Sequence, residues 1–237
     1  MLTSFLTADW RKLAMVNYAV PPNLLQPLVP KHTELDLFEG HCFVSLIGFL
    51  FDNVSLLGRP IPFHTTFEEV NLRFYVKHRA EDGTWKRGVT FVKEIVPKYA
   101  VSWVANAIYH EPYVTMPMRH HWENADDQLT VSYEWKKKEW HRLKLIADDT
   151  AIPMEVGSLE EFITEHYWGY TKYNASTTYE YGVEHPRWEI YPVKTQTIEV
   201  DFGAVYGSEF DFLTNQSPHS AVLAEGSAIV VKSAKKL

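Results

Sequence analysis

The sequence predicts a mainly β protein with a few helices, organised as one domain over residues 1–237. Short segments with alternating or continuous apolar residues are frequent, helical signals are few, and no repeat, low-complexity tract or Gly/Ser linker divides the chain. With 46% hydrophobic and 22% charged residues, the composition is that of a globular protein and excludes a disordered or fibrous one. Many strands with few helices favour a closed or nearly closed antiparallel sheet, because closure hides the strand edges.

The N-terminal half carries the clearest strand signals. Residues 41–51 are apolar on both parities, as in a strand covered on both faces. Residues 67–77 alternate between apolar and polar side chains, and after a turn signal at Asp82-Gly83 residues 87–96 form the expected partner strand. A short helix over residues 22–28 begins with a proline, which suits the first helical turn.

The rest of the chain adds further strands and three helical segments. The strands are expected at 129–135, 141–147, 177–181, 188–191, 195–202 and 221–231. A helix over 99–109 has apolar residues on all sides and is expected to be buried. A capping box at Ser158–Glu161 starts a helix to about Tyr167, and 203–213 holds one more turn.

The charge balance argues against a nucleic-acid partner. The chain has 23 basic and 30 acidic residues, a net charge of −7, whereas nucleic-acid binders usually present a basic face. The one dense basic run, Lys136–Lys138, is interpreted as a solvated hairpin tip.

We expect a cytoplasmic protein with no membrane partner. Asp9, Arg11 and Lys12 fall where a secretory signal would need an apolar core. The longest uncharged stretch, residues 13–30, contains four prolines and cannot form a membrane-spanning helix.

Neither a metal nor a cofactor is expected. The single cysteine, Cys42, excludes a disulfide framework and a thiolate zinc site, and it lies in the most apolar strand as a packed thiol. Walker A, G-x-G-x-x-G and G-x-S-x-G motifs are absent. The histidine-centred metal candidates lack ligand spacing; they are His120, His121, Glu123, His141, His166 and His185.

One polar strand face is the strongest candidate for a site. Glu69, Asn71, Arg73 and Tyr75 recur at period two on one side of the predicted strand. In a sandwich this face would meet water, whereas in a barrel it would line the interior and orient a polar ligand. Inside a barrel, desolvation would raise the pKa of Glu69 and Arg73 would lower it. The alternation of polar and apolar residues does not distinguish between a sandwich and a barrel.

Arg11 is a second candidate, because an arginine at the mouth of an apolar strand can hold a carboxylate through two hydrogen bonds. The alternative is a surface ion pair with Asp9 or another acid.

Several sequence runs resemble a known superfamily. The segments 10–18, 22–30 and 33–36 resemble the opening of acetoacetate decarboxylase. Together with FEEVNLRFYV (67–76), RGVTFVKEIVP (87–97) and EPYVTMPMRH (111–120), nearly the whole chain is similar to an uncharacterised bacterial family placed in that superfamily. The resemblance implies a cone-shaped antiparallel β-barrel with an interior pocket, and homo-oligomers.

The decarboxylase site residues are matched only in part. Its arginine falls on Arg11, and one pocket glutamate falls on Glu69, with Glu68 as the neighbouring possibility. The position of the other pocket glutamate corresponds to Ser45 or Leu46, so this glutamate is missing.

The resemblance also implies a lysine that forms a Schiff base with a keto acid, and this lysine is absent. Met118 stands at the position of this lysine. The following residue, Arg119, stays protonated and cannot condense with a carbonyl. Lys93 and Lys98 lie elsewhere in the pattern and are poor substitutes. We therefore reject Schiff-base decarboxylation.

Three functions remain. In the first, the barrel binds a small carboxylate or carbonyl metabolite, with Arg11 and Arg119 as anion contacts beside Met118, and with Glu69, Asn71 and Arg73 shaping one wall. In the second, Glu69 is the general acid/base of an enzyme without a Schiff base, together with His120 or Tyr75. In the third, the barrel serves assembly or interaction only and holds no ligand.

Overall fold

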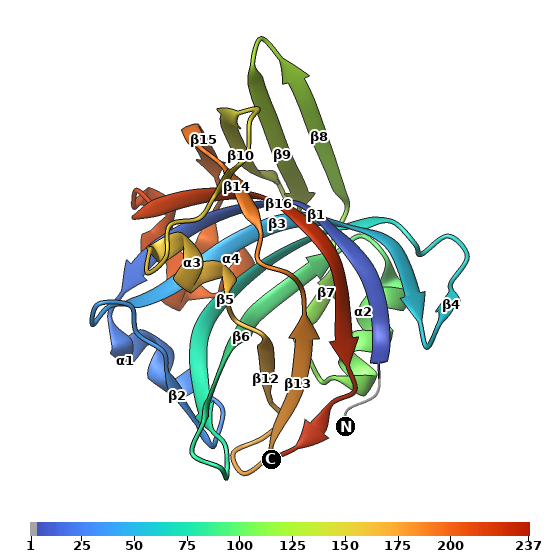
Figure 1. The fold of residues 1–237 in the computed structure, drawn as a ribbon, viewed down its shortest axis with the longest axis vertical. Coiled ribbons are helices and arrows are strands. Elements are labelled where there is room, and N and C mark those ends of the chain that lie inside the picture. Colours follow the sequence, from blue (N-terminus) through green and yellow to red (C-terminus); the bar gives the residue numbers. More distant parts are fainter. Residues whose placement is uncertain (1–3) are drawn as a thin grey trace.

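A closed ring of strands forms the body of the protein. The computed structural model describes residues 4–237, and its larger sheet has 13 strands. Seven of them follow one another around the ring, which closes because the last pairs with the first: β16 (Ser220–Lys232), β1 (Ser4–Val20), β3 (Cys42–Leu56), β5 (Phe67–Arg79), β6 (Trp85–Val96), β12 (Trp168–Lys172) and β13 (Thr178–Glu184). Figure 1 shows these strands curving around a common interior.

The predicted mainly β, barrel-like fold is confirmed, with one difference in strand direction. The pairing of β12 with β6 is parallel, so the ring is not antiparallel throughout. Short strands extend the sheet outside the ring: β2 (Thr33–Leu35), β4 (Arg59–Pro60), β7 (Tyr113–Thr115), β11 (Ile152–Pro153), β14 (Glu189–Tyr191) and β17 (Lys235–Lys236).

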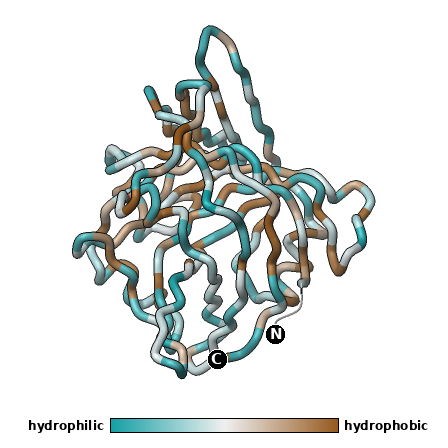
Figure 2. Tube along the Cα trace, viewed as in Figure 1, coloured by the Kyte–Doolittle hydropathy of each residue, from teal (hydrophilic) through white to brown (hydrophobic). Residues whose placement is uncertain are grey.

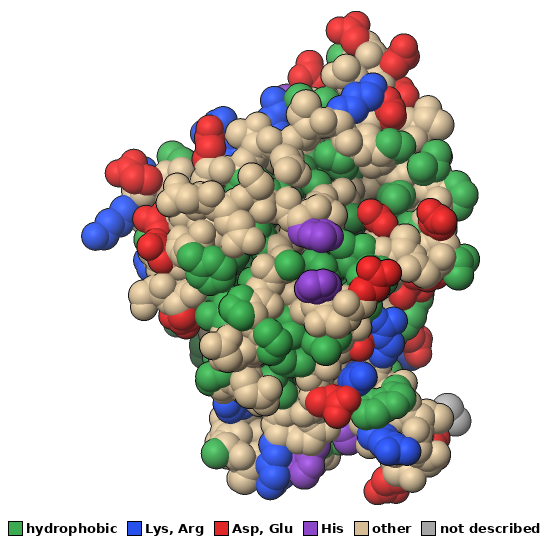
Figure 3. Space-filling model, turned by 90° about the vertical axis from the view of Figure 1, so that its left-hand side faces the viewer, with side chains coloured by type: hydrophobic (Ala, Val, Ile, Leu, Met, Phe, Trp, Pro, Cys, Tyr) green, Lys and Arg blue, Asp and Glu red, His purple; other side chains and the backbone are tan. Residues whose placement is uncertain are grey.

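A second, four-stranded sheet lies across β1, β3 and β5. Its order is β15 (Val193–Glu199), β10 (Trp140–Asp148), β9 (Gln128–Lys136) and β8 (Met118–Ala125). The β8–β9 hairpin projects at the top of Figure 1, its tip is mostly hydrophilic in Figure 2, and acidic side chains gather at that end in Figure 3.

The two sheets share a hydrophobic core that lies outside the ring. The apolar row of β5, which includes Leu72 and Phe74, packs against Tyr133 and Trp135 of β9 and against Leu143 of β10. These side chains are fully buried. The outward face of β5 is therefore its apolar face, and its polar face points into the ring.

The helices are short; two of them contribute to the core between the sheets, and two contribute to the apolar cluster inside the ring. They are α1 (Pro22–Leu25), α2 (Tyr99–Ile108), α3 (Leu159–Thr164) and α4 (Phe202–Tyr206), with 3-10 turns η1 (Gln26–Leu28) and η2 (Ser208–Asn215). Half of the predicted capping box is present: Ser158 Oγ accepts the N–H of Glu161 at 3.2 Å, whereas the Glu161 carboxylate accepts the N–H of Gly157, at 2.6 Å, and not that of Ser158. However, α3 ends at Thr164 because Glu165 leaves the helical conformation at ψ 53°.

The predicted helix over residues 99–109 is present as α2, but the expectation that it is buried is wrong. In α2 the side chains of Tyr99, Trp103 and Ile108 are exposed. The helix turns Val101 and Val104 toward a cavity inside the ring, so only one of its sides is covered. The apolar residues on one side of this helix form part of the cavity wall, and those on the opposite side are exposed to solvent.

Among residues 4–237, no helix combines the length and the apolar character that crossing a bilayer requires.

Candidate functional site

The ring encloses a cavity of about 210 Å³. Its wall is mostly apolar and comes from β1, β3, β5, β6, α2 and the segments around β12 and β13. The polar side chains among its lining residues include His64, Glu69, Asn71, Arg73, Glu94, Tyr109, Glu111, Tyr113, Thr164, His166, Tyr181 and His185. An apolar cavity with a few convergent polar groups has the character of a small-molecule site.

Strand β5 supplies three of these polar residues by simple alternation. Glu69, Asn71 and Arg73 point into the cavity, while Leu72 between them points into the core. The neighbouring candidate Glu68 lies on the other face, where its carboxylate meets Nδ1 of His120 at 2.8 Å.

Three glutamates gather at one side of the cavity. Glu69 accepts hydrogen bonds from Asn71 Nδ2 at 2.9 Å and from the hydroxyl of Tyr113 at 2.8 Å. Glu111 accepts from Thr171 Oγ1 at 2.6 Å and from the hydroxyl of Tyr181 at 2.8 Å.

The third carboxyl, that of Glu94, is less well satisfied. Glu94 lies directly opposite Asn71 in the β5–β6 pairing. Its Oε2 atom and the Oδ1 atom of Asn71 are buried without a hydrogen-bond partner among the described residues. Unpartnered buried polar atoms are costly, so these two atoms are among those that a ligand could satisfy.

Burial raises the pKa of all three carboxyls in this cluster. Loss of solvation raises the pKa of Glu69 to about 7 and that of Glu111 to about 7. Burial also raises the pKa of Glu94 well above its usual range, and the nearby Glu111 and Glu69 raise it further. Protonated carboxyls can donate a hydrogen bond, which ionised ones cannot.

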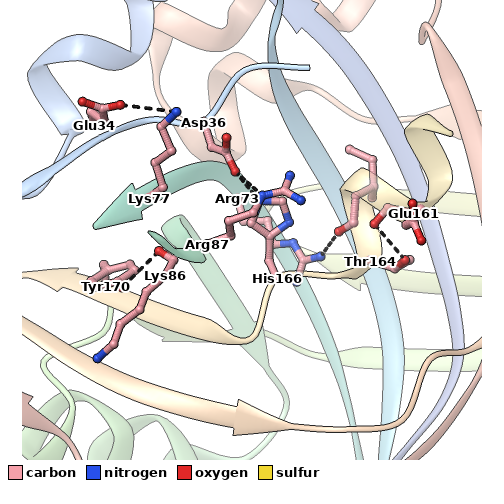
Figure 4. Close-up of polar contacts among 11 residues, drawn as sticks. Glu34, Asp36, Arg73, Lys77, Lys86, Arg87, Glu161, Thr164, His166 and Tyr170 are labelled. Carbon is pink, nitrogen blue, oxygen red and sulfur yellow. Dashed lines mark hydrogen bonds and ion pairs between the residues drawn. The ribbon is translucent and has the colours of Figure 1, made fainter. Parts of the chain in front are cut away.

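A second polar group lies farther along β5. The side chain of His166 is fully buried, and its Nε2 atom lies 3.1 Å from Oδ2 of Asp36. The same carboxylate oxygen accepts from Nε of Arg87 at 2.6 Å. Nη2 of Arg73 donates to the carbonyl of Ile163 at 3.0 Å, and Figure 4 shows Arg73, Arg87, Asp36 and His166 together.

Burial determines the charge of His166, and the ion pair with Arg87 helps to determine the charge of Asp36. Burial lowers the pKa of His166 to about 4, so its imidazole is neutral at pH 7. Burial works to raise the pKa of Asp36, but the hydrogen bonds from His166 and Arg87 outweigh it and lower that pKa. Asp36 is therefore an ionised carboxylate.

Arg11 does not lie among the residues that line the cavity. Its side chain is 39% exposed and pairs with Asp9 at 3.5 Å, which is the surface alternative. The lining residues of this segment are Trp10 and Leu13, because a β-bulge with Lys12 at φ 52° turns the intervening side chains outward.

Met118 and Arg119 also lie away from the cavity. Both belong to β8 of the second sheet, where Met118 packs on the outer core. Arg119 is 60% exposed, pairs with Glu134 and lies 4.3 Å from the ring of Trp140. Within the run of residues 111–120, the side chains that line the cavity are instead those of Glu111 and Tyr113. After β7 the chain passes into β8 of the second sheet, away from the cavity.

Sequence reasoning missed Glu94, Glu111 and the Asp36–His166 pair. Glu94 had one usable signal, since it is an acidic residue within a predicted apolar strand. Glu111 and His166 follow helices and reach the cavity through long-range packing, for which the sequence holds no local signal. In residues 4–237, no group of three or more His, Cys, Asp or Glu side chains is arranged to hold a metal ion.

Comparison with known sequences gives one family and one relative. The profile of the family DUF2071, described as an uncharacterized conserved protein, matches residues 7–228. A Bacillus subtilis (strain 168) protein named "Uncharacterized protein YqjF" is 29% identical over 182 residues, which are 75% of this chain and 72% of that protein.

Comparison with solved structures identifies the fold. Acetoacetate decarboxylase from Legionella pneumophila is similar with a TM-score of 0.68, at 13% identity, over 98% of this chain and 87% of the other. An acetoacetate decarboxylase-like enzyme from Sphingomonas wittichii RW1 gives 0.65, at 12% identity, over 99% and 94%. The enduracididine biosynthesis enzyme MppR complexed with pyruvate gives 0.66, at 10% identity, over 100% and 91%.

Proposed function

Since the chain belongs to the DUF2071 family and has the fold of acetoacetate decarboxylase, we propose that it binds a small carbonyl or carboxylate metabolite inside the ring, without Schiff-base chemistry. The observation that carries the proposal is the cavity of about 210 Å³ with a cluster of buried glutamates. By comparison, an engineered apolar cavity of roughly 150 Å³ admits benzene. A structural neighbour, MppR, is complexed with pyruvate, a small keto acid.

The cavity wall supports the exclusion of Schiff-base chemistry. Among the described residues that line it, none is a lysine, and Arg73 is the one with a permanent positive charge. Arg73 is thus the cationic residue that a polar group of the ligand can contact, in place of Arg11 and Arg119.

The glutamate cluster supports a carbonyl group on the ligand. A protonated Glu94 carboxyl donates a hydrogen bond, and a carbonyl oxygen accepts one. A bare carboxylate at the same place would meet three acidic groups and lose its hydration. We therefore place the carbonyl oxygen of the ligand at the Glu94 carboxyl, because the free Oδ1 atom of Asn71 only accepts hydrogen bonds.

Thermal unfolding with a panel of small ketones, aldehydes and keto acids tests this proposal. A ligand at about 100 times its dissociation constant adds roughly 2.7 kcal/mol to the free energy of unfolding. Glu94→Met should weaken ketone binding by about tenfold or more, because it removes the donor. Glu94→Gln, which keeps a donor, should retain binding, and Glu123→Met on the exposed hairpin should leave binding unchanged. No stabilisation by any member of the panel would refute the proposal.

Glu69 favours a second candidate, an enzyme that uses this residue as a general acid/base. Its pKa of about 7 and its place in the cavity suit proton transfer near neutral pH. The readout is exchange of the α-hydrogens of a bound ketone with deuterium, followed by NMR. Glu69→Gln should slow this exchange by about 100-fold while ligand binding persists. Exchange no faster than in buffer would dismiss the candidate.

The homo-oligomer implied by the family resemblance remains a prediction, and light scattering of the purified chain checks it.

A further inference from the structure

Two buried nitrogen atoms in the group around Arg73 have no partner. They are Nδ1 of His166 and Nε of Arg73, and both side chains line the cavity. In the described part of the chain no hydrogen-bonding atom reaches either of them. Native proteins rarely leave buried polar atoms unsatisfied, so the pair indicates a missing ligand group.

The hydrogen bond to Asp36 determines what His166 offers to the cavity. An ionised carboxylate only accepts hydrogen bonds, so the Nε2 atom of His166, at 3.1 Å, must carry the proton. A neutral imidazole has one proton, and Nδ1 therefore presents a lone pair. Arg87 holds Asp36 in place, and the rings of Tyr75 and Phe162 pack on the imidazole at 4.7 and 5.0 Å.

Arg73 offers the complementary group beside it. Its guanidinium lies 5.6 Å from the centre of the same Tyr75 ring that packs on His166. Nη2 is engaged by the carbonyl of Ile163, three residues before His166, which leaves the Nε–H free to donate. Figure 4 shows the Arg73 and His166 side chains next to each other.

We propose that His166 Nδ1 and Arg73 Nε–H together bind a hydroxyl group, which makes the ligand a hydroxylated carbonyl compound. A hydroxyl donates to Nδ1 and accepts from Nε–H, so it satisfies both atoms. A carboxylate satisfies Arg73 but turns acceptor oxygens toward the lone pair of His166. An ammonium group satisfies His166 but is repelled by Arg73.

The spacing of the two polar groups sets the length of the ligand. This inference rests on the proposed function, in which the carbonyl lies at Glu94, directly opposite Asn71 in the β5–β6 pairing. Asn71 and Arg73 are neighbours on one face of β5, and two residues of a strand span about 7 Å. A chain of a few carbon atoms between carbonyl and hydroxyl covers that distance.

Isothermal titration with three ligands of one chain length tests the inference. The probes are methyl propyl ketone, the same ketone with a terminal hydroxyl, and levulinate. The hydroxyketone should bind about tenfold or more tightly than the parent ketone, and levulinate should bind more weakly than the hydroxyketone.

Substitutions at His166 give the matched controls. His166→Leu should abolish the preference for the hydroxyketone but leave binding of methyl propyl ketone. His166→Asn should keep part of the preference, because its side-chain oxygen lies near the position of Nδ1. His141→Leu removes a buried histidine from β10, in the second sheet, and should leave the preference intact.

NMR of the histidine nitrogens tests the proton position on His166 first without and then with the probes. In protein labelled with ¹⁵N-histidine, the His166 resonances should report an unprotonated Nδ1, and only the hydroxyketone should shift that resonance strongly. A protonated Nδ1 at pH 7, equal affinity for the two ketones, or a preference for levulinate overturns the inference while the proposed function stands. Failure of all three probes to bind counts against the proposed function and the inference together.

Discussion

Glu111 reaches the cavity directly after His110, a residue in the left-handed region at φ 58°. The two hydrogen bonds from Thr171 and Tyr181 tend to lower its pKa, yet burial dominates and raises it to about 7. The folded chain thus keeps a proton on Glu111 at pH values where the unfolded chain, with a pKa of about 4.5, has lost it. Its contribution to stability therefore falls as the pH rises from about 4.5 through about 7.

Glu111→Gln removes this titration. At pH 4 the variant and the parent protein should have similar free energies of unfolding, since both side chains are neutral in both states. At pH 8 the variant should be more stable by roughly 1–3 kcal/mol, because the amide loses no stability as the pH rises. Urea unfolding at both pH values measures the difference, with Glu123→Gln on the exposed hairpin as the control. A difference that does not change with pH would contradict the assignment.

At the scale of elements, the β12–β13 hairpin brings Tyr181 to Glu111. Gly169 of β12 lies opposite Tyr181, and a Cβ atom at Gly169 would fall 2.1 Å from Cζ of that ring. The glycine therefore leaves room for the tyrosine that donates to Glu111.

Gly169→Ala should destabilise the protein by about 1–3 kcal/mol, because it overpacks the wall of the cavity. It should also weaken ketone binding, since Tyr181 must move. Gly182→Ala on the partner strand is the matched control, because the nearest atom to its Cβ would be 3.5 Å away. Thermal unfolding and ligand titration of both variants give the comparison; equal behaviour would show that Tyr181 is not held by this contact.

The elements also show what the sequence can and cannot specify. Alternation in residues 67–77 correctly placed Glu69, Asn71 and Arg73 on one face, because a strand has a period of two. Which face is interior depends on the second sheet, whose position over Leu72 results from long-range packing. Arg11 was misplaced because the bulge at Lys12 interrupts the alternation of β1, and a bulge leaves no clear signal in the sequence.

At the scale of the whole molecule, the ring closes through a short seam. β13 and β16 share two residue pairs, Val183 with Val231 and Glu184 with Val230, whereas β1 pairs along most of its length with β3. Local opening requires the least free energy where the fewest contacts must break. β12 also pairs with β6 at only two residue pairs, so the β12–β13 hairpin is held by short pairings on both sides and is the weakest part of the wall.

Hydrogen exchange followed by NMR should show this difference. The amides of β12, β13 and β17 should exchange through local opening, with lower protection than the buried amides of β3 and β5. A ligand in the cavity should raise the protection of β12 and β13, because they carry Tyr181 and Gly169 of the wall. Uniform protection around the ring would mean that the wall opens only by global unfolding.

The outward-facing core has a consequence for divergence within the family. Even-numbered residues of β5 such as Leu72 and Phe74 hold the two sheets together, while the odd-numbered Glu69, Asn71 and Arg73 meet whatever occupies the interior. Alternate residues of one strand therefore determine ligand specificity and fold stability, so substitutions at the cavity-facing positions can change the ligand with little loss of stability.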